Sequence, residues 1–221
     1  MTLPAHIRAE ASRDLGVRIA GVHGVGGGCI SPAYRITCDD GSSVFLKTAP
    51  AGAPAEMLMR EAESLERIAA TGRVRVPHVR AVASSWLALE WLEPAAANDA
   101  AWGELGRALA RLHRVGSERY GWSSANFIGP LPQSNDPADD WPTFWRTQRL
   151  EPQLRRARDQ LGSETVARLE RLLDELALRL GPAAADGPSL LHGDLWNGNV
   201  HFTAGRGALI DPASYYGHRE V

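Results

Sequence analysis

The densest group of reactive side chains lies in LLHGDLWNGNVHF (190–202) and the following ALIDP (208–212). Asp194 and Asn199 are five residues apart, and Asp211 follows twelve residues later. Phosphoryl transfer needs a carboxylate that orients the acceptor hydroxyl and takes its proton, and oxygen ligands that hold Mg²⁺ on the phosphates of ATP. Asp194 on a tight loop suits the first role. Asn199 and Asp211 suit the second, because a hairpin between them would bring Asp211 back beside Asn199. Each residue alone is more often structural, but the spacing is typical of a kinase catalytic loop.

Lys47 is the only lysine of the chain, and the other 23 basic residues are arginine. Heavy use of alanine, glycine and arginine indicates codon bias, which explains the scarcity of lysine but not its retention at this position. A compact ammonium on a flexible stem fits a phosphate as a point charge, whereas a planar guanidinium needs a different pocket. We therefore predict that Lys47 binds the phosphates. Glu61 is its predicted partner, because it adjoins the apolar stripe of the next helix and faces inward more than Glu66.

Two further segments are candidates for nucleotide contacts. GVGGGCISP (24–32) matches neither a P-loop nor a strict GxGxxG, but the backbone amides of Gly26, Gly27 and Gly28 could cover phosphates. LEWLE (89–93) would present backbone groups to adenine at Glu90 and Leu92. Cys29, among the glycines, is either a redox-responsive thiol or a small residue in a turn.

The hydrophobic pattern predicts the elements that position these residues. A helix is expected over 3–15, and a second over 55–70 that ends at Gly72. Strands are expected over 17–22, 33–37, 43–48, 79–84 and 86–91. After Pro94 the pattern becomes helical: one helix is capped by Asn98 and closed by Gly116, and others cover 139–161 and 164–180, the last capped by Ser163. Short strands over 199–202 and 208–210 form the hairpin. The fold class is therefore α+β, with a β-rich N-lobe (1–93), a hinge near 90–98 and a helical C-lobe (94–221).

Composition further narrows the class of protein to which this chain can belong. The net charge of −2 gives no sequence-independent attraction to nucleic acid or to a membrane surface. Two cysteines are too few for a disulfide scaffold, and neither a signal peptide nor a membrane-spanning run is expected. A reduced, cytoplasmic protein is the expectation.

The sequence resembles the fructosamine kinase family, also called ketosamine-3-kinases, from about residue 15 to its end. The segments that carry the resemblance are GGGCIS (26–31), EAESL (61–65), RVP (75–77), LHR (112–114), GW (121–122), NFIG (126–129), DW (140–141), FW (144–145), LLHGDLWNGN (190–199) and DPASYYGHREV (211–221). LHGDLWNGN together with YYGHRE is much more specific to this family than the general kinase elements are.

The resemblance implies a two-lobed protein-kinase-like fold and phosphorylation, by ATP with Mg²⁺, of the sugar 3-hydroxyl of ketosamines, free or protein-bound. The phosphorylated adduct then decomposes and frees the amine. By motif, Asp194 is the base, Asn199 and Asp211 are the Mg²⁺ ligands, and Lys47 with Glu61 binds phosphate. Trp196 is either a wall for the sugar or a packed loop aromatic, and the aromatic residues of 141–145 either shape the acceptor site or belong to the core.

Family members continue past the REV motif, so an incomplete C-lobe is expected for a chain that stops at Val221. Apolar faces left uncovered would favour low stability or dimerisation, so that monomer and homodimer both stay open. Two alternatives to the ketosamine kinase also stay open. One is another small-molecule kinase, acting on an aminoglycoside, choline or a sugar alcohol, although the near-neutral charge argues mildly against a polycationic acceptor. The other is a nucleotide-binding module with impaired catalysis.

Overall fold

The computed structural model describes residues 2–26 and 31–221, and these form two compact units. The first unit combines Met1–Leu109 with Asp194–Ala213, and the second combines Ala110–Gly193 with Ser214–Val221. Both units are discontinuous in sequence, whereas the predicted lobes divide the chain once, between residues 93 and 94. The predicted lobe boundary stays a prediction. All residues singled out for chemistry from 194 to 211 lie in the first unit with Lys47 and Glu61.

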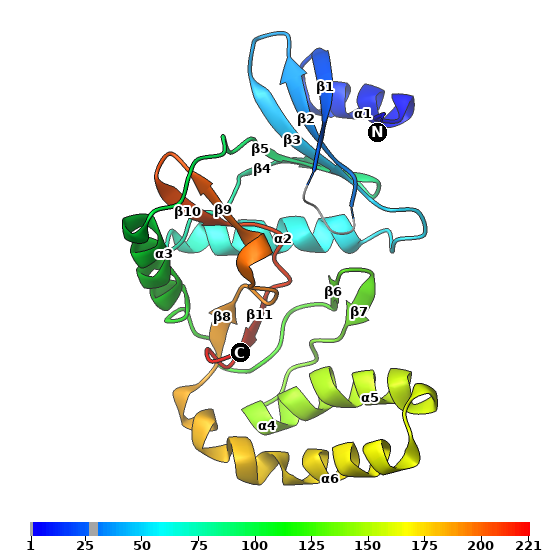
Figure 1. The fold of residues 1–221 in the computed structure, drawn as a ribbon, viewed down its shortest axis with the longest axis vertical. Helices are drawn as coiled ribbons and strands as arrows, with labels where there is room; N and C mark the ends of the chain where they lie inside the picture. The colour runs from blue at the N-terminus through cyan, green and yellow to red at the C-terminus, as the bar shows by residue number, and fades with distance from the viewer. Residues whose placement is uncertain (1, 27–30) are drawn as a thin grey trace. The chain divides into compact units, whose positions relative to one another are not determined.

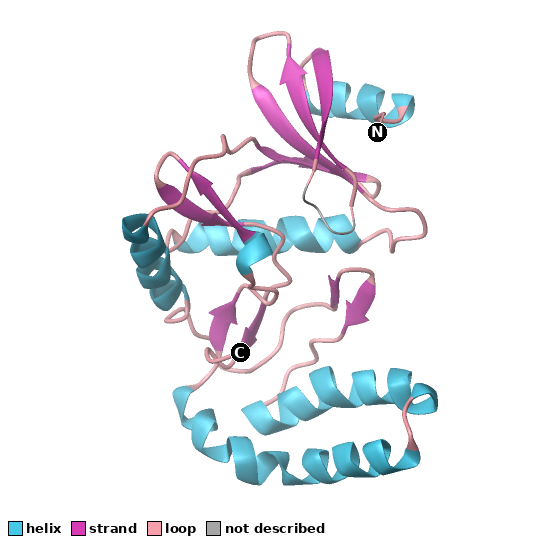
Figure 2. Ribbon diagram, in the orientation of Figure 1, coloured by secondary structure: helices cyan, strands magenta, loops and turns pink. Residues whose placement is uncertain are grey.

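A five-stranded antiparallel sheet in the order β1-β2-β3-β5-β4 dominates the first unit (Figures 1 and 2). The strands are β1 (Ile19–Val25), β2 (Ala33–Cys38), β3 (Ser43–Thr48), β4 (Val79–Val82) and β5 (Trp86–Glu90). The pattern of alternating apolar residues predicts all five, with ends shifted by a few residues. Because β3 lies in the middle of the sheet, side chains on both of its faces are held by neighbouring strands.

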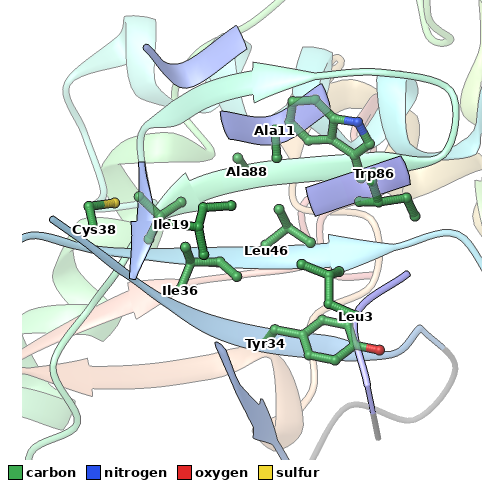
Figure 3. Close-up of a cluster of buried hydrophobic side chains, with 11 residues drawn as sticks. Leu3, Ala11, Ile19, Tyr34, Ile36, Cys38, Leu46, Trp86 and Ala88 are labelled. Atoms are coloured by element: carbon green, nitrogen blue, oxygen red, sulfur yellow. The ribbon is translucent and has the colours of Figure 1, made fainter. Parts of the chain in front are cut away.

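Helix α1 (Ala5–Leu15) covers one face of this sheet. Its apolar side packs into a core with alternate residues of the strands, among them Ile36 and Leu46, which are completely buried (Figure 3). The indole Nε1 of Trp86 donates a hydrogen bond of 3.2 Å to the Glu10 carboxylate, which fixes the helix to β5. The predicted helix over 3–15 is therefore confirmed, with Leu3 packed just before its first turn.

Helix α2 (Met57–Thr71) packs on the other face of the sheet and buries Leu58, Leu65 and Ile68 completely. Gly72 ends it in the left-handed conformation (φ 61°), as the sequence predicts, and its N–H bonds to the carbonyl of Ala69. Successive side chains of a strand point to opposite faces. Leu46 therefore points towards α1, and its neighbour Lys47 points towards α2.

The predicted hairpin is formed by β9 (Val200–Thr203) and β10 (Arg206–Leu209). Its loop consists of Ala204 and Gly205, both with positive φ (47° and 73°), which is the conformation that two-residue hairpin loops require. A short 3₁₀ helix (Asn197–Asn199) leads into β9. Both ends of the hairpin therefore carry predicted site residues.

Helix α3 (Asp99–Leu112) begins where the sequence predicts, because the Asn98 side chain accepts a hydrogen bond of 2.8 Å from the N–H of Ala101. It ends four residues before Gly116, so the prediction that Gly116 closes this helix is wrong. Two turns follow Leu112, and Gly116 instead pairs with Ser189 in an isolated bridge.

The second unit contains an antiparallel pair of helical segments. The first is α4 (Trp141–Phe144), a π-helix (Trp145–Leu150), α5 (Glu151–Ala157) and a 3₁₀ turn (Arg158–Gln160), where the sequence predicts one helix. The second is α6 (Ser163–Leu180), followed by a 3₁₀ segment (Gly181–Asp186). Ser163 is the first helical residue and Gly162 occupies the cap position, so the prediction of a Ser163 side-chain cap is wrong.

Two small sheets of the second unit are not predicted by the sequence pattern. They are β6 (Asn126–Ile128) with β7 (Leu131–Gln133), and β8 (Ser189–Leu191) with β11 (Tyr215–Gly217). Trp141 and Phe144 are buried against Tyr120 and Tyr215, and Trp145 packs beside them. Of the two interpretations of these aromatic residues, the structure supports the core one.

None of the helices in the part of the chain that the structure describes combines the length and the apolar character that a membrane span needs.

We expect Leu46→Ala to lower the free energy of unfolding by about 2–5 kcal/mol, because it leaves a cavity in the completely buried core between α1 and the sheet. Val82→Ala, in edge strand β4, is the matched control: Val82 is 40% exposed, and its truncation should cost less than about 1 kcal/mol. Urea unfolding followed by circular dichroism measures both. Equal losses would contradict this placement of the core.

Candidate active site

Lys47 contacts two carboxylates from different parts of the first unit. Its Nζ lies 2.8 and 3.0 Å from the two oxygens of Glu61 and 3.0 Å from Oδ1 of Asp211. The side chains of Lys47 and Glu61 are 12% and 9% exposed, whereas that of Asp211 is 38% exposed. One ammonium therefore joins strand β3, helix α2 and the segment that follows the hairpin.

Burial and charge act against each other at this cluster. Burial lowers the pKa of Lys47, but the carboxylates of Glu61 and Asp211 more than offset it, so that the pKa rises above its ordinary value. Burial raises the pKa of Glu61, and the ammonium of Lys47 opposes that rise. The raised pKa of Lys47 favours the charged ammonium, which is the form that holds phosphate oxygens.

Asp194 and Asn199 are joined by a second set of contacts. The Asn199 amide Nδ2 donates to the backbone carbonyl of Asp194 at 2.8 Å and to its Oδ2 at 3.2 Å. Asn199 is buried, and its backbone carbonyl accepts a hydrogen bond of 3.0 Å from the N–H of Ile210. The hairpin thus brings Asp211, the next residue, back towards Asn199. The hairpin that the sequence predicts is present, and the metal-ligand roles of Asn199 and Asp211 stay predictions.

Asp211 has a positive φ of 55°, which is uncommon for a residue with a side chain. Aspartate tolerates this conformation better than most residues, and such backbone strain is concentrated at functional sites. It changes the direction of the chain after Leu209, so that the carboxylate meets Lys47 instead of continuing the pairing of the hairpin.

Trp196 is 53% exposed, and its ring lies directly over Gly198. A Cβ at position 198 would lie within 2.3 Å of the indole, so only glycine allows this contact. The ring is thus held at the surface two residues from Asp194. The ring packs on its own loop and stays half exposed, so both predictions for Trp196, a wall for the sugar and a packed loop aromatic, stay predictions.

Glu90, the last residue of β5, and Leu92 are expected to offer main-chain groups to adenine, but several of their polar groups already contact other parts of the protein. The carbonyl of Leu92 lies 3.1 Å from Nε2 of His201, and the N–H of Glu90 donates to the carbonyl of His78 at 2.8 Å. The Glu90 carboxylate accepts from Arg75 Nη2 at 2.9 Å. These groups are therefore occupied by protein contacts. Sequence reasoning missed His201, because a histidine in a short strand carries no signal of a long-range contact.

The glycine-rich segment is described only in part. Gly26 is exposed, and a Cβ added there would meet no atom within 4 Å. Gly27, Gly28 and Cys29 lie outside the described residues, so their predicted roles stay predictions.

The donor set suits a hard divalent cation shared with a phosphate-bearing substrate. Asp211 offers a carboxylate, and Asn199 uses its amide nitrogen towards Asp194, which leaves the amide oxygen as the atom to offer a cation. Among the described residues there is no group of three or more histidine, cysteine, aspartate or glutamate side chains that could hold a metal. A site with few protein ligands is what Mg²⁺ uses when phosphates and water complete its coordination.

The fold is that of protein-kinase-like phosphotransferases. A crystal structure of a candidate fructosamine-3-kinase from Thermobifida fusca superimposes with a TM-score of 0.83, covers 97% of this chain and 75% of its own, and is 35% identical. The predicted fold class is confirmed. Phosphotransferases of this class use ATP and a divalent metal ion.

The family model described as fructosamine kinase matches residues 4–221, so the chain belongs to the fructosamine kinase family. A protein named probable ketoamine kinase from Synechocystis is 36% identical over 92% of this chain and 70% of its own length. A chloroplastic protein-ribulosamine 3-kinase of Arabidopsis thaliana is 37% identical over 92% of this chain. The chain spans 64% of the length of that plant enzyme. The family resemblance that the motifs indicate is therefore confirmed.

We expect Lys47→Met to lower the free energy of unfolding by about 3–5 kcal/mol, because it leaves the buried Glu61 carboxylate without its cation. Arg60→Met, which breaks the more exposed pair with Glu63 on the same helix, is the control and should cost less than about 1 kcal/mol. Urea denaturation of both variants beside the parent measures the difference. If both lose the same small amount, Lys47 does not hold this cluster together.

Proposed function

We propose that this protein transfers the γ-phosphoryl group of ATP to the 3-hydroxyl of a ketosamine, the sugar adduct of an amine. The observation that carries the proposal is the joint placement of Lys47, Glu61 and Asp211 with the Asp194–Asn199 pair in one unit of a fructosamine kinase family member. The names of the curated relatives, ketoamine kinase and protein-ribulosamine 3-kinase, support this acceptor class.

Asp194 is the proposed base. Asn199 holds its carboxylate and its main chain, so that the carboxylate is oriented before an acceptor hydroxyl arrives. It takes the proton of that hydroxyl as the oxygen attacks the γ-phosphorus, and ADP leaves with the electrons of the broken bond. The loss of the proton keeps the attacking oxygen nucleophilic until the new P–O bond has formed.

Lys47 is the proposed phosphate ligand, and Glu61 fixes its position and supplies a counter-charge. Asn199 and Asp211 are the proposed ligands of Mg²⁺, which neutralises charge on the phosphates when it is bound. Lys47 also contacts Asp211 directly. The proposed phosphate ligand is therefore in contact with one of the two proposed metal ligands. The backbone of Gly26, Gly27 and Gly28 is proposed to cover the phosphates. Glu90 and Leu92 are proposed to border the adenine.

Trp196 is proposed as a wall for the sugar ring. Its support is its 53% exposure and its fixed contact with Gly198; the two residues lie two and four positions after Asp194.

Removal of the phosphorylated sugar from the amine then amounts to deglycation. A cytoplasmic location and a monomeric or homodimeric state remain parts of the proposal.

Initial rates of ADP release with ribuloselysine, fructoselysine, kanamycin and choline test the acceptor class. Turnover is expected with the two ketosamines alone. Turnover with kanamycin or choline alone would establish the rival small-molecule kinase. Binding of ATP with no turnover of any acceptor would establish the nucleotide-binding module with impaired catalysis.

Asp194→Asn should lower kcat by about 10²–10⁴-fold, because the amide cannot accept the hydroxyl proton. Asp39→Asn, an exposed carboxylate of the turn between β2 and β3, is the matched control and should retain the parental rate. Thermal unfolding of both variants shows whether the fold is intact. An Asp194→Asn variant as active as the parent would remove Asp194 from the mechanism.

Lys47→Arg should keep the positive charge and the fold yet lose most of the phosphorylation rate, because a guanidinium places its donors differently from a point charge. Steady-state kinetics with ketosamine and ATP measure the loss. Full activity of this variant would show that position 47 requires only a cation.

A further inference from the structure

The hairpin β9–β10 carries one proposed metal ligand before its first strand and the other after its second. Asn199 directly precedes Val200, and Asp211 follows Leu209 by two residues. An isolated two-stranded hairpin is only marginally stable in water, so its position must be fixed by contacts outside itself. The contacts that fix it therefore also fix the separation of the two ligands from the nucleotide.

Main-chain and apolar contacts with other parts of the first unit hold the hairpin in place. The N–H of Leu209 donates to the carbonyl of Arg75 at 2.9 Å, and the N–H of Ala95 donates to the carbonyl of Phe202 at 2.8 Å. The Phe202 ring lies 4.7 Å from that of Trp102, and Gly207 closely approaches Leu105. Substitution of a side chain elsewhere in the hairpin leaves these contacts in place.

His201 makes a different kind of contact. Its Nε2 lies 3.1 Å from the carbonyl oxygen of Leu92, which can only accept, so Nε2 carries the hydrogen. Leu92 is 7% exposed and belongs to the segment proposed to border adenine. His201 lies in β9, two residues after Asn199, which ends the 3₁₀ helix that leads into this strand, so a displacement of the start of β9 moves both residues.

We propose that His201 is a positioning residue, whose hydrogen bond to Leu92 sets the metal-binding hairpin at the correct distance from the nucleotide-binding segment. The inference rests on the proposed roles of Asn199, Asp211 and the 89–93 segment. Through this bond, Mg²⁺ and ATP meet ligands that are already aligned, and each enhances the binding of the other. Arg75 supports the same alignment, since its main chain pairs with β10 and its side chain pairs with Glu90.

The test is the affinity of the protein for ATP, measured by calorimetry with and without Mg²⁺. In His201→Leu, the enhancement of ATP affinity by Mg²⁺ should fall about two- to tenfold, the value of one hydrogen bond, while metal-free affinity is unchanged. His201→Gln retains a donor nitrogen at a similar reach and should restore most of the enhancement. Arg206→Leu, at the exposed end of the same hairpin, is the control and should match the parent.

A merely structural role of His201 predicts a different pattern. It lowers the thermal midpoint of His201→Leu without changing the Mg²⁺ enhancement, and that result overturns the proposal. Failure of His201→Gln to restore the enhancement that His201→Leu has lost also overturns it. Failure of the parent protein to bind ATP in the presence of Mg²⁺ overturns the proposed function instead, so the two failures are distinguished without an assay of turnover.

Discussion

The ion pairs of Lys47 with Glu61 and Asp211 are the interaction on which the first unit depends. A buried ammonium is stable only when its charge is compensated. The two carboxylates that pair with Lys47 come from helix α2 and from a segment 150 residues further along the chain. Three separate pieces of chain therefore have to meet at one nitrogen atom. The central position of β3 in the sheet makes that meeting point rigid, because strands on both sides hold Lys47 in register.

The other contacts near the site serve the same requirement of fixed distances. Asn199 holds Asp194 through both main chain and side chain, and the hairpin returns Asp211 to the neighbourhood of Asn199. Gly198 lets the Trp196 ring lie against the backbone close to Asp194. Each of these contacts replaces conformational freedom with a fixed geometry, which is how a phosphotransferase accelerates a reaction in which the protein does little covalent chemistry.

Local rules account well for the elements of the first unit and less well for those of the second. Apolar alternation predicts the five strands, Gly72 predicts the end of α2, and Asn98 predicts the start of α3. The end of α3 and the cap of α6 were predicted wrongly, because Gly116 and Ser163 have the right residue type while other turns end or begin the helices. The three-residue strands β6, β7, β8 and β11 are too short to produce a periodic signal.

The sequence by itself determined the chemical groups of this protein and their order. A lone lysine at the end of a strand, a glutamate on the next helix, and the Asp–Asn spacing before a hairpin are visible in the residues, since each follows from a local pattern. Only the tertiary structure decided which groups meet: Lys47 with Asp211, separated by 164 residues, and His201 with Leu92, separated by 109. Such contacts depend on how strands and helices pack, and no local pattern of residues records a partner so far away in the chain.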